Sequence, residues 1–340
     1  MNPLKALQGF GQSVWLDYIR RGLIVSGELK KLIEQDGLRG VTSNPAIFEK
    51  AIAGSTDYSA ALDELQGRPD LDAMGLYESL AIRDIQDAAD VIRSVYDQTR
   101  GRDGYVSLEV SPLLARDTRK TIEEARRLWK AVGRDNVMIK VPATPEGIPA
   151  IEQLIGEGLN VNVTLLFAER AYEGVAQAYI AGLQSLAARG GNVSRVASVA
   201  SFFVSRIDTA IDAIATARLK TAESPAERAL LRSIMGKVAI ANAKLTYQRY
   251  QEIFRSQRWQ ALALKGAQTQ RVRGPAPAPR TRATGTCCTW RNSSGPTPST
   301  RSRRPPSRPS ATTAGRVPAW RRGWRRPTTP WPSWKRSASR

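Results

Sequence analysis

Short apolar segments alternate with longer amphipathic segments from Ser13 to about Lys265. The short segments have the length of β-strands, and they are residues 13–19, 38–42, 105–110, 137–141, 160–166 and 195–203. The amphipathic segments have the spacing of helices, and the longest are residues 118–131, 169–188 and 225–255. This order predicts an α/β fold with a parallel sheet, either open and doubly wound or closed into a barrel.

One helix is outlined by the residues at its two ends. Leu29, Leu32 and Ile33 lie at positions i, i+3 and i+4 and so form one apolar face. Ser26 precedes them as a candidate N-cap, and Gly37 follows them as a candidate C-terminal stop. We therefore expect a helix between Ser26 and Gly37.

The alternation of side chains within the strands distinguishes the two architectures. Alternate residues of a strand face opposite sides of the sheet. In three strands one set of alternate residues is apolar, and these sets are Val106/Leu108/Val110, Val137/Ile139/Val141 and Val161/Val163/Leu165. The opposite sets carry polar groups, and they are Ser107/Glu109/Ser111, Met138/Lys140/Pro142 and Asn160/Asn162/Thr164. A sheet covered by helices on both faces would be apolar on both sides, so the pattern favours a (β/α)8 TIM barrel with its polar residues inside.

Lys140 is the basic residue among these inward positions. A lysine in such a strand can reach solvent at a rim, pair with a carboxylate or act as a functional amine. Burial disfavours the charged form of an amine, and a neutral amine attacks a ketone to give first a carbinolamine and then an iminium ion. The iminium ion accepts electrons, so that a nearby carbon–carbon bond of the substrate can break.

Two carboxylates are expected to share the interior with Lys140. Asp17 comes from the first strand and Glu109 from the third, and they could supply the acid and base groups that such a cycle needs. The alternative interpretation is that both carboxylates neutralise Lys140 in a buried ion network. Neutral groups that could hold hydroxyls or a water come from Asn44, Asn162 and Thr164.

The composition changes abruptly near residue 265. The net charge of the chain is +20, but 17 of its 51 lysines and arginines lie beyond residue 265, where there is no aspartate or glutamate. Residues 1–265 therefore hold 34 basic and 31 acidic residues, a net charge of only +3. The terminal segment also lacks Leu, Ile, Phe, Tyr and Met, so we expect the tail, residues 271–340, to be disordered.

Other sequence features exclude several classes of site and location. The adjacent pair Cys287–Cys288 lacks the spacing of metal ligands. No apolar run approaches the ~18 residues of a membrane span, and residues 1–10 lack the apolar core of a signal peptide. We therefore expect a cytoplasmic protein without a metal or a membrane partner.

Six segments resemble successive barrel strands of the transaldolase family, particularly its longer bacterial type. They are SVWLDY at 13–18, VTSNP at 41–45, SLEVSP at 107–112, VMIKVPAT at 137–144, NVNVTLLF at 160–167 and ASFFVSRID at 200–208. The resemblance extends to about Gln270, and the combination of IKVPAT with NVNVTLLF is its most specific part.

The resemblance implies a role for each inward polar residue. Lys140 would be the Schiff-base lysine, Asp17 the acid/base for carbon–carbon cleavage, and Glu109 and Thr164 the groups that activate a catalytic water. The substrate would be bound by Asn44 and Asn162 at its hydroxyls, by Ser201 and Arg206 at its phosphate, and by Phe203 as a wall. The implied reaction, in the non-oxidative pentose phosphate pathway, transfers a dihydroxyacetone unit from sedoheptulose 7-phosphate to glyceraldehyde 3-phosphate. It needs no metal or organic cofactor.

The resemblance ends near Arg271. The family continues with a strand similar to LLWASTGTKNP, whereas this chain continues RVRGPAPAPRTRATGTCCTW. Residues 273–300, back-translated with G/C-rich codons and read in a shifted frame, can give WASTGTKNPGYRDVLYVEELIGPDTVN, which resembles the missing family sequence. We interpret the tail as a frameshift product. The prediction is an incomplete barrel over residues 1–270, with strands seven and eight replaced by the disordered basic tail.

Three alternative functions remain open at this stage. The chain could be an inactive frameshifted fragment, or a different Schiff-base aldolase, against which Asp17 and the SFFVSR segment argue. It could also be a nucleic-acid-binding protein, because arginines and tryptophans alternate in Trp320–Lys335. We expect sugar phosphates rather than nucleic acid as the selected partners, and the sequence carries no signal for oligomeric state.

Overall fold

The computed structural model describes residues 2–66, 72–275 and 285–289, all of which belong to one compact unit. Predictions about residues 276–284 and 290–340, including the Trp320–Lys335 segment, lie outside the described residues.

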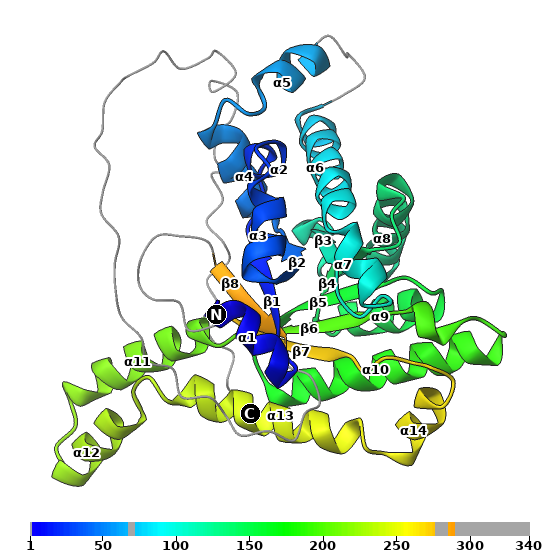
Figure 1. Cartoon of the computed structure of the whole chain (residues 1–340). Coiled ribbons are helices and arrows are strands. Elements are labelled where there is room, and N and C mark those ends of the chain that lie inside the picture. Colours follow the sequence, from blue (N-terminus) through cyan, green and yellow to red (C-terminus); the bar gives the residue numbers. More distant parts are fainter. Residues whose placement is uncertain (1, 67–71, 276–284, 290–340) are drawn as a thin grey trace. The chain divides into compact units, whose positions relative to one another are not determined.

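The described strands form a closed barrel in chain order (Figure 1). They are β1 (Ser13–Asp17), β2 (Leu38–Thr42), β3 (Tyr105–Glu109), β4 (Val137–Pro142), β5 (Val161–Leu166), β6 (Ser198–Phe202), β7 (Arg271–Pro275) and β8 (Gly285–Thr289). From β1 to β7 each strand is parallel to the next, whereas β8 is antiparallel to both β7 and β1. The TIM-barrel class is thus confirmed, with an antiparallel strand at the point of closure.

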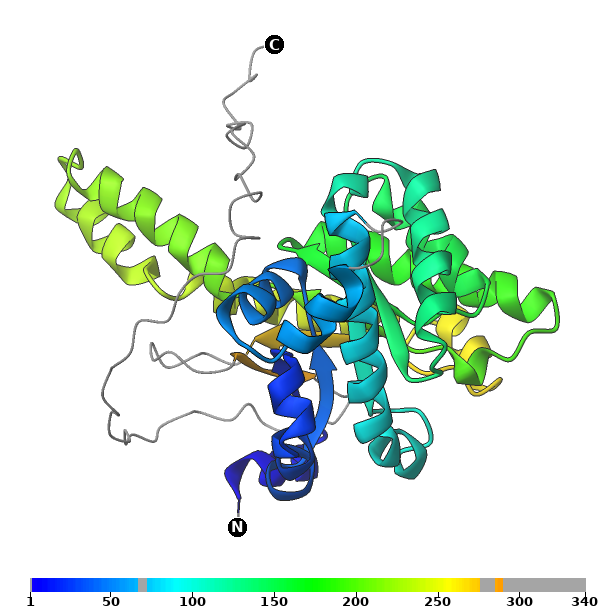
Figure 2. The same ribbon diagram turned by 90° about the horizontal axis from the view of Figure 1, so that it is seen from above.

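Helices connect and surround the strands (Figures 1 and 2). The α-helices are α1 (Pro3–Ala6), α2 (Arg21–Val25), α3 (Glu28–Asp36), α4 (Pro45–Gly54), α5 (Ser59–Gln66), α6 (Ala73–Val91), α7 (Arg93–Gln98), α8 (Thr118–Val132), α9 (Gly147–Gly156), α10 (Glu169–Ala188), α11 (Ser205–Leu219), α12 (Pro225–Ile234), α13 (Val238–Ile253) and α14 (Gln257–Ala263). Short 3-10 turns occupy Leu7–Phe10, Pro112–Leu114 and Val193–Arg195. None of the helices in the described ranges is long and apolar enough to cross a membrane.

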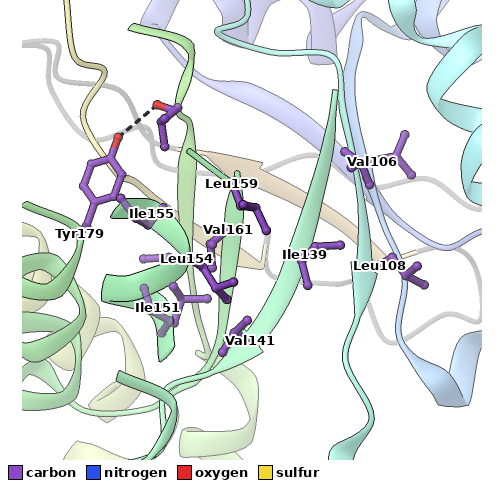
Figure 3. Close-up of a cluster of buried hydrophobic side chains, with 14 of the residues drawn as sticks. Val106, Leu108, Ile139, Val141, Ile151, Leu154, Ile155, Leu159, Val161 and Tyr179 are labelled. Carbon is purple, nitrogen blue, oxygen red and sulfur yellow. Dashed lines mark hydrogen bonds between the residues drawn. The ribbon is translucent and has the colours of Figure 1, made fainter. Parts of the chain in front are cut away.

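The outward side chains of the strands pack on these helices, as the alternation predicts. Figure 3 shows Val106 and Leu108 of β3 and Ile139 and Val141 of β4 in one cluster with apolar side chains of α9. All four belong to the main hydrophobic core and are almost completely buried. Burial of each such side chain stabilises the fold by roughly 1.5–3 kcal/mol.

A second, smaller cluster fills the barrel interior toward the amino-terminal ends of the strands. This floor cluster consists of Trp15, Tyr105, Met138, Ala197 and Val199. The absence of a side chain at Gly40 allows the Trp15 indole to lie directly against β2, because a Cβ there would overlap the ring. The floor cluster closes the barrel below the polar residues.

The first predicted helix begins one residue later than expected. α3 starts at Glu28 with Gly27 as its N-cap, and Ser26 ends the preceding α2 instead. Gly27 has φ 77°, a left-handed conformation that glycine adopts at little cost, and it redirects the chain between the two helices. The predicted stop at Gly37 is confirmed, with φ 69°.

The segment 225–255 forms two helices rather than the single helix predicted. α12 ends at Ile234 and α13 begins at Val238. Gly236 between them has φ 67°, which a right-handed helix cannot accommodate.

The prediction that the chain forms no strand beyond residue 270 is wrong for two segments. Residues 271–273 pair with Val199, Ala200 and Ser201 of β6, and residues 285–289 pair with β1 and β7. Composition argued against a folded tail because it lacks large aliphatic residues. A strand added to an open barrel edge, however, needs mainly backbone partners, and β1 and β6 both provide unpaired backbone groups.

Candidate active site

Lys140 lies in the barrel interior at the centre of β4. Its side chain is 7% exposed, and Nζ lies 2.9 Å from Oε2 of Glu109. Nζ also donates a hydrogen bond of 2.8 Å to the backbone carbonyl oxygen of Ser43. Glu109 and Lys140 are register partners on β3 and β4, so the sheet itself holds the amine and the carboxylate side by side.

A chain of hydrogen bonds crosses the interior beside this pair. Asn162, the register partner of Lys140 on β5, donates through Nδ2 to Oγ of Ser107 at 3.0 Å. Its Oδ1 accepts from Oγ of Ser201 at 2.8 Å, and Oγ of Ser43 donates to the carbonyl oxygen of Ser107 at 2.7 Å. Asn162 is fully buried with both ends of its amide engaged, so its orientation is fixed.

Thr164 occupies the next inward position of β5 and is buried. The register of β5 and β6 shifts between Val163 and Leu166, and Leu165 has φ 61°. Such a bulge interrupts the alternation of side chains. Leu165 is therefore 40% exposed and Leu166 is buried, so the prediction that Leu165 packs in the outward apolar set is wrong.

Asp17 ends β1 and is only partly buried. Within the described ranges it forms no ion pair, and Lys140 pairs with Glu109 alone. The ion-network interpretation is therefore correct for Glu109 and not for Asp17.

Asn44 follows β2 and caps the N-terminus of α4. Its Oδ1 accepts the backbone N–H of Ile47 at 3.0 Å. Because the cap uses the carbonyl oxygen, Nδ2 is the group that Asn44 can offer to a ligand.

Phe203 and Arg206 lie at the carboxyl end of β6, where it meets α11. Phe203 stacks on Phe167, with ring centroids 4.8 Å apart and planes at 11°. The Arg206 guanidinium lies 4.6 Å above the Phe203 ring. Arg206 is in the first turn of α11, is exposed, and has no acidic partner among the described residues.

The alternation in the sequence identified Ser107 as an inward residue without assigning it a partner. It gave no signal for two further groups, one that contacts Lys140 and one that interacts electrostatically with Glu109. The first is the carbonyl of Ser43, which a side-chain pattern cannot reveal. The second is Tyr77 on α6, which packs edge-on to Phe48 at 6.1 Å. Burial, together with the charges of Glu109 and Glu78, raises the pKa of Tyr77 to about 12.

The described residues contain no group of three or more His, Cys, Asp or Glu side chains arranged to hold a metal ion. Lys140 pairs with Glu109, Asn162 connects Ser107 with Ser201, and Ser43 joins the two groups through its contacts with Lys140 and Ser107. Asp17, Asn44, Phe203 and Arg206 are not part of that network. They lie at or just beyond the carboxyl ends of their strands, which is where TIM-barrel enzymes place their active sites.

Comparison with known proteins agrees with this arrangement. The family model described as transaldolase/fructose-6-phosphate aldolase matches residues 14–274. The chain is 51% identical over 271 residues to a transaldolase of Trichodesmium erythraeum, covering 80% of this chain and 71% of the relative. It is 52% identical over 272 residues to transaldolase 2 of Nostoc punctiforme, with the same coverage. A transaldolase of Thiobacillus denitrificans is 48% identical over 270 residues, covering 79% of this chain and 73% of the relative. The matched region contains all the site residues described above, and the chain belongs to the transaldolase/fructose-6-phosphate aldolase family.

Proposed function

We propose that this chain is a transaldolase that transfers a dihydroxyacetone unit from sedoheptulose 7-phosphate to glyceraldehyde 3-phosphate through an imine on Lys140. The reaction is that of the non-oxidative pentose phosphate pathway. The observation that carries the proposal is the buried amine of Lys140, which lies 2.9 Å from the Glu109 carboxylate.

Formation of the imine requires a neutral amine. Glu109 lies within hydrogen-bonding distance of Nζ and can accept its proton. Nζ then attacks the ketone carbon to give a carbinolamine. Glu109 returns its proton to the carbinolamine hydroxyl, which leaves as water and yields an iminium ion. Thr164, buried at the next inward position of β5, would hold that water together with Glu109.

Cleavage of the carbon–carbon bond requires a separate base. Asp17 is suited to this role because it forms no ion pair among the described residues and is only partly buried. It takes the proton of the substrate's C4 hydroxyl, and the C3–C4 bond breaks with its electrons moving toward the iminium nitrogen. The aldehyde leaves, and the remaining enamine attacks the acceptor aldehyde by the reverse steps.

We assign one set of binding groups to the hydroxyls of the substrate and another to its phosphate. The second N–H of the Asn162 amide and the Nδ2 group of Asn44 would donate hydrogen bonds to the hydroxyls of the dihydroxyacetone unit. The phosphate would lie against Ser201, Arg206 and the first turn of α11, since a guanidinium and a helix N-terminus both favour anions. Phe203, stacked on Phe167, forms a rigid apolar wall beside it.

The proposal is tested by turnover of fructose 6-phosphate with erythrose 4-phosphate as acceptor. We expect formation of sedoheptulose 7-phosphate, and we expect Lys140→Arg to abolish it because a guanidinium stays protonated and cannot form the imine. Lys130→Arg, at an exposed position of α8, is the matched control. Release of glyceraldehyde 3-phosphate at the same rate without acceptor would indicate an aldolase instead. Full turnover by Lys140→Arg would contradict the role of Lys140.

A further inference from the structure

Three N–H donors around Trp15 in the barrel interior have no hydrogen-bond partner among the residues that the structure describes. They are Nε1 of Trp15, Nη2 of Arg271 and Nε of Arg273, all completely buried. None of these groups can accept a hydrogen bond, so only an acceptor could satisfy them. Buried donors without a partner are rare in folded proteins, because a donor that loses its hydrogen bonds to water and gains none in the protein destabilises the fold.

The three donors belong to one region. Arg271 and Arg273 alternate on β7 and therefore point to the same side of the strand. Both guanidinium groups lie against the Trp15 ring, with their Cζ atoms 6.0 and 5.5 Å from its centroid. The two arginines are 8% and 5% exposed and Trp15 is fully buried, so the region is closed to bulk solvent.

The charges in this region do not balance. Arg271 pairs with the buried carboxylate of Asp103 at 2.5 Å. Arg273 has no acidic partner among the described residues, and its Nη1 donates a hydrogen bond of 3.3 Å to Oγ of Ser201. The two other interior carboxylates do not compensate it, since Glu109 pairs with Lys140 and Asp17 forms no ion pair within the described ranges. A buried cation without a counter-charge is strongly unfavourable.

We propose that the barrel interior binds a small inorganic anion of the halide type between Trp15, Arg271 and Arg273. Such an ion accepts hydrogen bonds from all three orphan donors and supplies the negative charge that Arg273 lacks. A large anion would not fit, because Tyr105 and Met138 of the floor cluster are fully buried around the same indole. The site differs from the Lys140–Glu109 pair, and Arg273 connects it to the proposed phosphate-binding residue Ser201 through a hydrogen bond of 3.3 Å.

The test is thermal unfolding of the full 340-residue chain at constant ionic strength, with chloride replacing gluconate. Binding to the folded state raises the melting temperature with the logarithm of the ligand concentration. We expect a rise of roughly 2–4 °C for each tenfold increase in chloride above its Kd. Arg273→Gln should remove this dependence. Arg119→Gln, at an exposed position of α8, should leave it intact.

A second variant is needed because Arg273→Gln could fail to fold. Trp15→Phe removes the indole N–H and keeps an aromatic ring, so it should weaken the chloride dependence without abolishing folding. A melting temperature of the wild-type chain that does not respond to chloride would overturn the proposal. An equal chloride response in wild type and in either interior variant would also overturn it, because the anion would then bind elsewhere.

Discussion

At the scale of single residues, the polar side chains of the barrel differ in how many hydrogen bonds and ion pairs they form with other residues of the protein. Lys140 and Asn162 each contact two partners, so their positions are fixed before any substrate arrives. Asp17 forms no ion pair among the described residues. A stepwise imine reaction needs both a preorganised nucleophile and a carboxylate that is free to exchange protons with the substrate.

Asp17→Asn should lower kcat by roughly 10²–10⁴-fold, the usual contribution of a general acid or base. The melting temperature should change little, because Asp17 is partly buried and in no ion pair of the described residues. Asp135→Asn is a suitable control, since the Asp135 side chain is 62% exposed on the surface. A normal kcat for Asp17→Asn would show that this carboxylate takes no part in the chemistry.

At the scale of elements, a buried ion pair anchors β7 to the barrel in addition to its pairing with β6 and β8. Asp103 is fully buried and pairs with Arg271. Asp103 also accepts a hydrogen bond of 3.1 Å from Oγ of Ser13, and so it links β7 to β1. Removing one member of a buried pair leaves the other charge uncompensated.

Asp103→Ala should therefore reduce the free energy of unfolding by about 3–5 kcal/mol. Asp97→Ala removes a surface pair in which the aspartate is 58% exposed, and it should cost less than about 1 kcal/mol. Chemical denaturation of both variants measures the difference. Equal losses would mean that the Asp103–Arg271 pair does not anchor β7.

The α8–α9 pair should respond to acid through Glu157. Its hydrogen bonds with Arg126 lower the pKa of Glu157 in the folded state. A lowered folded-state pKa contributes stability above the unfolded value of ~4.3, and this contribution is lost as the pH falls through the folded value.

The difference in unfolding free energy between wild type and Glu157→Gln should therefore be largest above about pH 5 and shrink toward pH 3. Urea denaturation at several pH values measures it. A difference that is constant, or that grows at low pH, would contradict the assigned pair.

The sequence predicts those elements in which the order of apolar and polar residues alone determines the structure. The inward and outward sides of β3 and β4 follow from strict alternation, and Lys140 and Glu109 were placed together on that basis. The bulge at Leu165 and the break at Gly236 were missed, because each depends on backbone conformation rather than on side-chain polarity. The hydrogen bond from Lys140 to the Ser43 carbonyl and the electrostatic effect of Glu109 on Tyr77 depend on tertiary packing, which no local pattern reports.

At the scale of the whole molecule, the main correction concerns closure. Composition predicted that the barrel ends open after residue 270, whereas β7 and β8 pair with β6 and β1. Closure removes the exposed edges that β1 and β6 would otherwise present. The frameshift interpretation of the tail stays a prediction, which the coding DNA around codon 270 tests.

Truncation separates the closing strands from the rest of the tail. A chain of residues 1–295, the compact unit, should unfold cooperatively. A chain of residues 1–270 should lack a sharp thermal transition and bind hydrophobic dye, because it exposes two strand edges and the interior beside them. Indistinguishable transitions for the two chains would show that β7 and β8 do not stabilise the barrel.

The central claim is that Lys140 forms the covalent intermediate, and reductive trapping tests it most directly. The full chain is incubated with fructose 6-phosphate and sodium borohydride, digested and analysed by mass spectrometry. We predict a reduced dihydroxyacetone adduct on the peptide containing Lys140, absent without substrate and absent in Lys140→Arg. An adduct on a different lysine, or turnover without any adduct, would contradict the account.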